Sequence, residues 1–213
     1  MIINEYPRLR YKCPSCGLPY LESVYRSGGM LGFHAFSDGS VDRLAHSSLW
    51  ITCCPCCHAY FAKKQLLPLE APLDFDEPCG SLDSGNENRY SIPFWESVLA
   101  QGLFFPDNVG IKERNETLLK ARLSLWQAAN RGRAGFGEGK YQRLCRTLLC
   151  EIAPERDADR LTVAELYRNL GDFDAALGAL RFVREKRKHA LRYRAIERAA
   201  LDGCKETVKI NII

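Results

Sequence analysis

The strongest constraint on the fold of this chain is a pair of cysteine motifs with the same internal spacing. Residues 12–17 read Lys-Cys-Pro-Ser-Cys-Gly, and residues 53–58 read Cys-Cys-Pro-Cys-Cys-His. Two cysteines three positions apart in a tight turn present both thiolates on one side of the backbone. Two such turns offer four sulfur atoms to Zn²⁺ at about 2.3 Å and leave no open coordination position. We therefore predict one structural zinc ion with the ligands Cys13, Cys16, Cys54 and Cys57.

The second motif contains two overlapping pairs, so the ligand frame has to be chosen. Cys53 and Cys56 have a suitable spacing, but the pair one residue later also reproduces the Cys-Pro-x-Cys order of the first motif. In that frame the residue after each pair is Gly17 or His58, at a position that often needs positive φ. Cys53 and Cys56 are then spare thiols, which either fill the turn as small side chains or form a redox switch or a second metal site. A rubredoxin-type iron centre uses the same spacing, so the identity of the metal stays open.

Residues 1–64 are expected to form a small β-rich zinc ribbon with rubredoxin-type knuckles. The segments 21–26, 30–36 and 49–52 have the composition of short strands. Between the cysteine pairs, Ser37-Asp38-Gly39-Ser40 is a hairpin signal, because Asp-Gly accepts the positive φ of a tight turn. A fragment of this size buries too little apolar surface to fold alone, so a bound metal is a physical requirement.

Residues 65–92 are predicted to be an acidic linker or arm. Positions 65–88 contain six acids and no lysine or arginine, and prolines and glycines would interrupt a helix there. Residues 93–213 show helical periodicity instead. The expected helices, joined by short loops as antiparallel neighbours, cover residues 93–102, about 118–130, 140–151, 159–170, a segment directly after Gly171, and 189–201. The predicted fold class is α+β, with the ribbon followed by an antiparallel α-helical domain.

One helical hairpin, at about residues 159–188, resembles a tetratricopeptide repeat (TPR). The residues that carry the resemblance are Ala164, Tyr167, Gly171, Phe173 and Ala176. Small residues allow two helices to approach closely and aromatic residues fill the groove between them. Glycine ends the first helix, and Asp172 favours the start of the next. A single repeat implies an αα-hairpin more than a peptide-binding groove, because solenoids usually need three or more repeats.

The order of these parts resembles an uncharacterised bacterial family that joins an N-terminal Cys-Pro-x-Cys zinc ribbon to a C-terminal TPR-like helical region. Members carry a Ser-Gly-x…Ser-Asp-Gly stretch between the two cysteine pairs, which corresponds here to residues 27–29 and 37–39. The resemblance spans nearly the whole chain and implies this architecture without an activity. The doubled cysteines at 53–57 depart from the usual single pair.

Positive charge is concentrated in the second half of the chain, where 22 of the 30 Lys and Arg residues follow position 110. Beside a zinc ribbon, clustered cations favour a nucleic-acid surface, because they release counterions from phosphates. The residues of this alternative surface are Arg184, Lys186, Arg187, Lys188, Arg192 and Arg194. The competing interpretation is a solvated helix pair whose charges pair with the acidic linker.

The motifs that the sequence lacks also narrow the function. We find no phosphate-binding Gly-x-x-x-x-Gly-Lys loop, no Gly-x-Ser-x-Gly elbow and no His-Glu-x-x-His motif. No apolar run approaches the roughly 20 residues of a membrane span, no signal peptide is evident, and a cytoplasmic location is therefore expected. The sequence predicts a non-catalytic, zinc-binding adaptor or regulator with a protein partner. Nucleic-acid binding is the alternative, and an unfamiliar enzyme is the third hypothesis.

Overall fold

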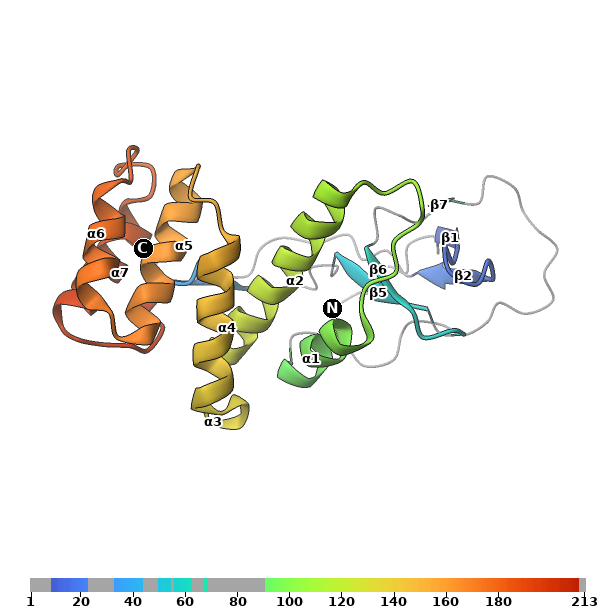
Figure 1. The fold of residues 1–213 in the computed structure, drawn as a ribbon, viewed down its shortest axis with the longest axis horizontal. Coiled ribbons are helices and arrows are strands. Elements are labelled where there is room, and N and C mark those ends of the chain that lie inside the picture. The colour runs from blue at the N-terminus through green and yellow to red at the C-terminus, as the bar shows by residue number, and fades with distance from the viewer. Residues whose placement is uncertain are drawn as a thin grey trace, which may run out of the picture. The chain divides into compact units, whose positions relative to one another are not determined.

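The fold is α+β, as predicted, in a computed structural model that describes residues 9–22, 33–43, 50–54, 56–62, 67–68 and 91–210 (Figure 1). The chain forms two compact units. The first, here called the cysteine unit, comprises Met1–Met30 and Ala45–Ala121. The second, here called the helical unit, comprises Leu31–Leu44 and Arg122–Ile213. Most of the predicted acidic linker, and the predicted turn at 27–29, lie outside the described residues.

Short antiparallel strands build the cysteine unit. One sheet has the strand order β2-β1-β7 and contains β1 (Leu9–Lys12), β2 (Pro19–Glu22) and β7 (Leu67–Pro68). A separate hairpin contains β5 (Ile51–Cys53) and β6 (Tyr60–Ala62), with Ile51 opposite Ala62 and Cys53 opposite Tyr60. The turn from β1 to β2 and the turn from β5 to β6 each carry one of the cysteine pairs.

Aromatic packing holds helix α1 (Ile92–Gln101) in the cysteine unit. The helix begins after Ser91, whose side chain accepts a hydrogen bond from the Phe94 amide, and it ends at Gly102 with φ +80°, as predicted. Trp95 is buried and its ring stacks on Trp50 at a centroid distance of 6.0 Å. These contacts give the unit an apolar core beyond the cysteine turns.

The remaining helices largely follow the predicted periodicity. They are α2 (Ile111–Arg131), α3 (Arg133–Phe136), α4 (Glu138–Glu151), α5 (Asp157–Leu170), α6 (Phe173–Arg181) and α7 (Ala190–Leu201). The first part of α2, to Ala121, belongs to the cysteine unit, and the rest belongs to the helical unit. The connection between the helices predicted at about 118–130 and 140–151 is not a loop throughout. It contains the single turn α3, which tolerates glycine and is followed by Gly137 with φ +84°.

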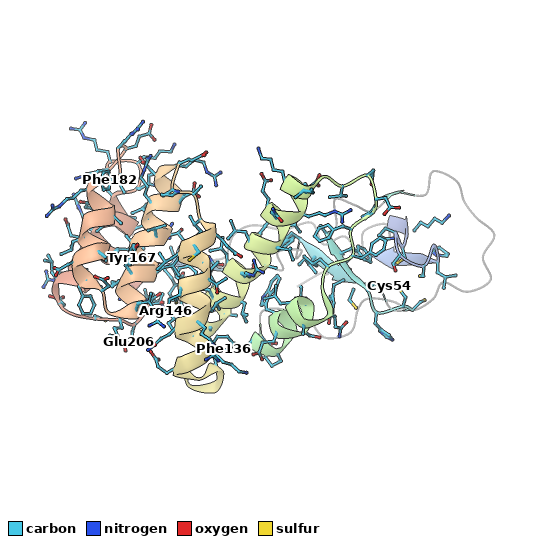
Figure 2. The ribbon with its side chains drawn as sticks, in the orientation of Figure 1. Cys54, Phe136, Arg146, Tyr167, Phe182 and Glu206 are labelled. Carbon is cyan, nitrogen blue, oxygen red and sulfur yellow. The ribbon has the colours of Figure 1, made fainter. Side chains whose placement is uncertain are left out.

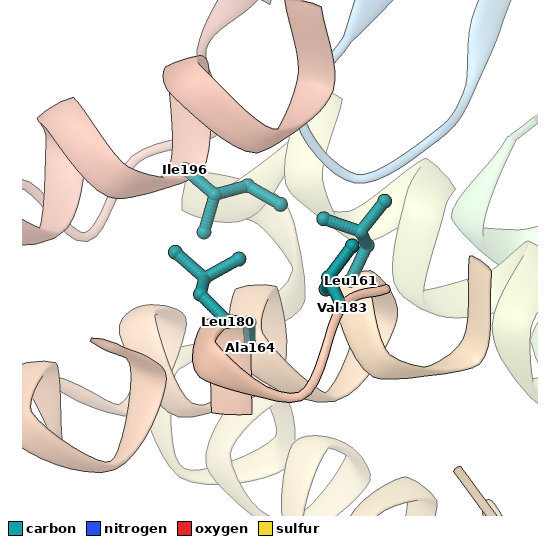
Figure 3. Close-up of a cluster of buried hydrophobic side chains, with 5 residues drawn as sticks. All are labelled: Leu161, Ala164, Leu180, Val183 and Ile196. Carbon is teal, nitrogen blue, oxygen red and sulfur yellow. The ribbon is translucent and has the colours of Figure 1, made fainter. Parts of the chain in front are cut away.

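The core of the helical unit joins α5, α6 and α7 (Figure 3). Its buried side chains are Leu161, Ala164, Leu180, Val183 and Ile196. Gly171, in the left-handed conformation at φ +86°, ends α5, and the Asp172 side chain accepts from the Ala175 amide to begin α6. The helices α5 and α6 therefore form the expected αα-hairpin, with α4 and α7 packed against α5.

A small sheet completes the helical unit. Its strand order is β4-β3-β8, and its strands are β3 (Phe33–Phe36), β4 (Val41–Arg43) and β8 (Lys209–Ile210). The turn between β3 and β4 confirms the predicted hairpin, and Gly39 in that turn has φ +81°. This hairpin lies between the two cysteine pairs in the sequence, but its contacts place it with the C-terminal helices. In the part of the chain that the structure describes, no helix is long and apolar enough to cross a membrane.

Candidate metal centre

The two cysteine turns have the same backbone hydrogen bonds. At the start of the first turn, the Cys13 amide donates to the carbonyl of Leu18 at 2.9 Å. At the start of the second turn, the Cys54 amide donates to the carbonyl of Ala59 at 3.0 Å. Each bond closes a turn between two antiparallel strands, so the first cysteine of each pair occupies an equivalent position.

The residue after each pair adopts the positive φ that the sequence predicts. Gly17 has φ +76° and its amide donates to the Cys13 carbonyl, while His58 has φ +57° and its amide donates to the Cys54 carbonyl. Within the described ranges, His58 is the one residue other than glycine with positive φ. A side chain in this region is strained, so the second turn keeps this conformation at an energetic cost that a bound ion can offset.

Backbone amides point toward the sulfur atoms inside both turns. The Cys13 Sγ accepts from the amides of Ser15 at 3.4 Å and Cys16 at 3.5 Å. The Cys54 Sγ accepts from the amide of Cys56 at 3.4 Å. Such hydrogen bonds favour the thiolate, which is the form of cysteine that binds metal.

The four predicted ligands come together. All sulfur atoms of Cys13, Cys16, Cys54 and Cys57 lie within 4.8 Å of one another. Two of the separations, Cys13 to Cys57 and Cys16 to Cys54, are 3.8 Å. A tetrahedral ion with metal–sulfur bonds of about 2.3 Å requires sulfur atoms about 3.8 Å apart, so the cluster has the dimensions of a four-thiolate metal site.

The other two cysteines of the second motif lie outside this cluster. Cys53 Sγ is directed to backbone carbonyls, with His58 O at 3.4 Å. Cys56 packs against buried Cys13, Cys54 and Phe61, and it is disulfide-bonded. Cys53 and Cys56 therefore lie outside the ligand set, as predicted, but Cys56 is not a free thiol.

Burial divides the four sulfur ligands into an inner and an outer pair. Cys13 and Cys54 are 1% exposed and pack on Phe61, whereas Cys16 and Cys57 are exposed. Burial raises the pKa of the Cys13 thiol to about 12 and also raises the pKa of Cys54. At Cys57 burial again acts to raise the pKa, but hydrogen bonds from the Ala59 amide and neighbouring thiols outweigh it and lower the pKa to about 7. A metal ion would displace these protons, because the ligands bind as thiolates.

The cations of the alternative nucleic-acid surface have different environments. Exposed residues of this set are Arg184, Lys186, Arg187, Lys188 and Arg194. Lys188 pairs with Glu185 at 3.2 Å, and the Lys186 ammonium lies 5.0 Å from the centre of the Tyr193 ring. Arg192 instead faces the β3–β4 turn, where its Nε donates to the Ser37 carbonyl at 2.7 Å. Arg192 therefore contacts the β3–β4 turn and is not one of the exposed cations of this set.

A buried polar cluster in the helical unit has no counterpart among the sequence predictions. The Ser37 hydroxyl donates to the Glu165 carboxylate at 2.5 Å and accepts from the Val208 amide at 2.9 Å. Glu165 pairs with Arg168 at 2.5 Å, and both side chains are 0% exposed. Arg168 also donates to the carbonyl of Cys204. One ion pair thus connects the β3–β4 turn, α5 and the segment before β8.

The Asp38 carboxylate adds a second connection, to helix α2. Its Oδ1 accepts from the Ser40 amide and hydroxyl at 2.8 and 2.6 Å, and its Oδ2 accepts from Asn130 at 2.8 Å.

The sequence signal for this buried polar cluster lies in α5, because Glu165 and Arg168 follow Leu161 and Ala164 on the apolar side of the helix. Charged residues on an apolar face indicate a buried ion pair.

Comparisons with known proteins identify no relative. No family model matches the sequence, and no curated protein or solved structure is similar to it. The function must therefore be inferred from the geometry of this chain.

Proposed function

We propose that the protein is a non-catalytic, zinc-binding adaptor or regulator that binds another protein. The observation that carries this proposal is the cluster of four sulfur atoms at tetrahedral separations. Four thiolates saturate the ion, so no position is open for water or substrate, and the metal serves to hold the fold. In this proposal the paired cysteine turns form a zinc ribbon with Cys13, Cys16, Cys54 and Cys57 as ligands.

Zinc is the proposed ion because the role is structural. Iron in a four-thiolate site has similar dimensions, but its usual use is electron transfer. The inner cysteines pack on Phe61 and the outer cysteines reach solvent, so the ion would lie between the two turns and fix them to each other. That arrangement supports a stabilising role for zinc at the two turns, which share the buried cluster of Cys13, Cys54 and Phe61.

The TPR-like hairpin supports protein binding as the role of the helical unit. Ala164 and Ala176 are both 0% exposed, which allows the close approach of α5 and α6 that the repeat pattern implies. Repeats of this type stack on neighbouring helices and bind peptides through exposed helix faces. We propose that this hairpin supplies the surface for a partner.

Affinity capture from the native host with the intact, zinc-loaded chain tests this function. We expect a discrete protein partner that is retained by the folded chain and absent from a control with heat-unfolded chain. Binding of the purified partner should be saturable in a titration followed by calorimetry. Failure to retain any protein above the control would contradict the adaptor function.

The exposed cations favour a second candidate, which is nucleic-acid binding. Arg184, Lys186 and Arg187 are exposed in the connection between α6 and α7, where they could neutralise phosphates. Fluorescence anisotropy with labelled single-stranded and double-stranded oligonucleotides tests this candidate. Binding should be strongest at low ionic strength and fall steeply with added salt. An unchanged anisotropy at low ionic strength would eliminate it.

A further inference from the structure

The α5–α6 hairpin contains a groove that side chains of both helices line. Its volume is about 540 Å³, within the range of pockets that bind small ligands or a few side chains. The groove floor contains Val163 and Tyr167 from α5 and Ala175 and Ala179 from α6. These side chains are half-buried, and nothing in the described part of the helical unit fills the groove.

The edge of the groove exposes a large aromatic side chain. Phe182, directly after α6, is 72% exposed, while Tyr167 lies on α5 (Figure 2). Elsewhere on α5, Leu161 and Ala164 are fully buried in the core. An exposed phenylalanine next to an apolar groove is characteristic of a surface that a partner covers.

The charged side chains that line the groove are both arginines. Arg160 and Arg184 lie there, and none of the lining residues is acidic. The nearby Asp157 carboxylate is already engaged, because it accepts from the amides of Arg184 and Glu185 and pairs with Arg160 at 2.6 Å. This carboxylate therefore fixes the loop after α6 at the end of the groove and leaves the Arg184 side chain exposed.

The exposed cations continue from the groove along the same loop. Lys186, Arg187 and Lys188 follow Arg184, and Glu185, paired with Lys188, is the one acid among residues 183–189. The groove thus combines an apolar floor with a positively charged end. A peptide with an apolar side chain and nearby carboxylates is complementary to both features.

We infer that this groove binds a segment of a partner protein in which Leu, Phe or a similar side chain stands next to acidic residues. The apolar side chain packs on Val163 and Tyr167, and a carboxylate pairs with Arg184. This inference rests on the proposed adaptor function and names the chemistry of its partner. A second copy of the groove is a poor match, because it offers no acid to pair with these arginines.

Selection of peptides from a random 12-residue display library on the intact chain tests the inference. We expect the bound peptides to be enriched in an apolar residue flanked by Asp or Glu. A synthetic peptide of the selected sequence should bind more than about tenfold more weakly to Phe182→Ser and to Arg184→Glu. The matched controls are Leu191→Ser and Arg194→Glu, which change exposed residues of α7 outside the groove and should bind as the parent chain does.

Several results would overturn the inference. They are a library that yields no bound peptide, selected peptides without acidic residues, and selected peptides that Phe182→Ser and Arg184→Glu still bind. Self-association in sedimentation that disappears in Phe182→Ser would also overturn it, because the groove would then be an interface between copies. If the partner from the affinity capture binds these variants normally, the groove assignment fails and the adaptor function stands. If capture retains no partner, the adaptor function itself fails.

Discussion

The cysteine unit and the helical unit are stabilised in different ways. In the cysteine unit the strands are short, and Cys13, Cys54 and Phe61 form the buried cluster beneath the two turns. In the helical unit, α5, α6 and α7 share an apolar core, and a buried ion pair connects α5 to the β3–β4 turn and the C-terminal segment. A small β-rich fragment needs a cross-link, whereas packed helices can fold around their own core.

This difference predicts that the two units respond to different perturbations. Removal of the metal should affect the cysteine unit and leave the α5–α7 core in place. Changes in the buried polar cluster should destabilise the helical unit without releasing the metal.

Replacement of one inner ligand should have the largest effect. Structural zinc contributes about 10–16 kcal/mol of apparent folding free energy in small domains, so Cys54→Ser should release the ion and unfold the cysteine turns. Metal content and amide NMR signals of β5 and β6 provide the measurement. The control is Cys53→Ser, which should retain the metal ion and the amide signals of β5 and β6, because the Cys53 sulfur faces backbone carbonyls. Metal release from Cys53→Ser with retention in Cys54→Ser would contradict the ligand frame.

Breaking the buried ion pair should have the next largest effect. Arg168→Met leaves the Glu165 carboxylate buried without its partner, and the expected loss of unfolding free energy is about 3–5 kcal/mol. Chemical denaturation followed by helical circular dichroism measures this loss. In the double variant Glu165→Gln/Arg168→Met neither member of the ion pair is left as an unpaired buried charge, so part of the stability should return. A double variant less stable than Arg168→Met would contradict the cost of the unpaired carboxylate. Loss of metal from either variant would contradict the independent stabilisation of the two units.

A smaller effect is expected at the β3–β4 turn. Gly39 has φ +81°, and a Cβ there would lie 3.0 Å from the Arg192 guanidinium. Gly39→Ala should therefore lower the unfolding free energy of the helical unit by about 1–3 kcal/mol. The matched control is Gly178→Ala within α6, where a Cβ meets no atom within 4 Å and stability should rise by about 0.5–1 kcal/mol. Equal effects of the two substitutions would show that the turn does not pack as described.

The smallest expected effect depends on pH. Hydrogen bonds from the amides of Glu185 and Arg184 lower the pKa of Asp157 to about 2, from an ordinary value of 3.8. The folded state therefore favours the ionised carboxylate, and this stabilisation is present above about pH 4 and disappears as the pH falls toward 2. Asp157→Asn should be less stable than the parent chain near neutral pH, and the difference should shrink between pH 4 and pH 2.

The control for this prediction is Asp174→Asn, which changes an exposed acid in the first turn of α6. Urea unfolding at several pH values between 2 and 6 measures the difference for both variants. Because each variant is compared with the parent chain at the same pH, effects of acid on the cysteine turns cancel. A pH-independent difference for Asp157→Asn would contradict the hydrogen-bonded anchor of the loop.

Sequence patterns predicted most of the secondary structure and the cysteine cluster because these features depend on local chemistry. The repeated spacing of the two motifs placed Cys54 and Cys57 in the cluster, and the position after each pair required the positive φ found at Gly17 and His58. Helix ends at Gly102 and Gly171 follow from the same conformational preference. The cysteine pairs, the positions of positive φ and the helix ends each depend on residues that are close together in the chain. The two cysteine pairs could be joined over a longer distance because one zinc ion requires four ligands.

Long-range features could not be predicted in this way. Ser37 and Glu165 are distant in sequence, and neither motif nor periodicity indicates that they share a hydrogen bond. The β3–β4 hairpin was recognised as a hairpin, but its pairing with β8 depends on the approach of the C-terminal strand. Arg192 illustrates the same limit, because its place in a basic stretch gives no sign that it faces the Ser37 carbonyl.

The most direct test of the central claim is the metal content of the intact chain, purified without chelator and without added metal. Inductively coupled plasma mass spectrometry of this material should give one zinc ion per chain. The ion should be released only when the cysteine turns unfold, in step with the loss of amide signals from β5 and β6. Protein that is well folded in this region without metal, or that contains iron or more than one ion per chain, would contradict the assignment of Cys13, Cys16, Cys54 and Cys57 to a structural zinc site.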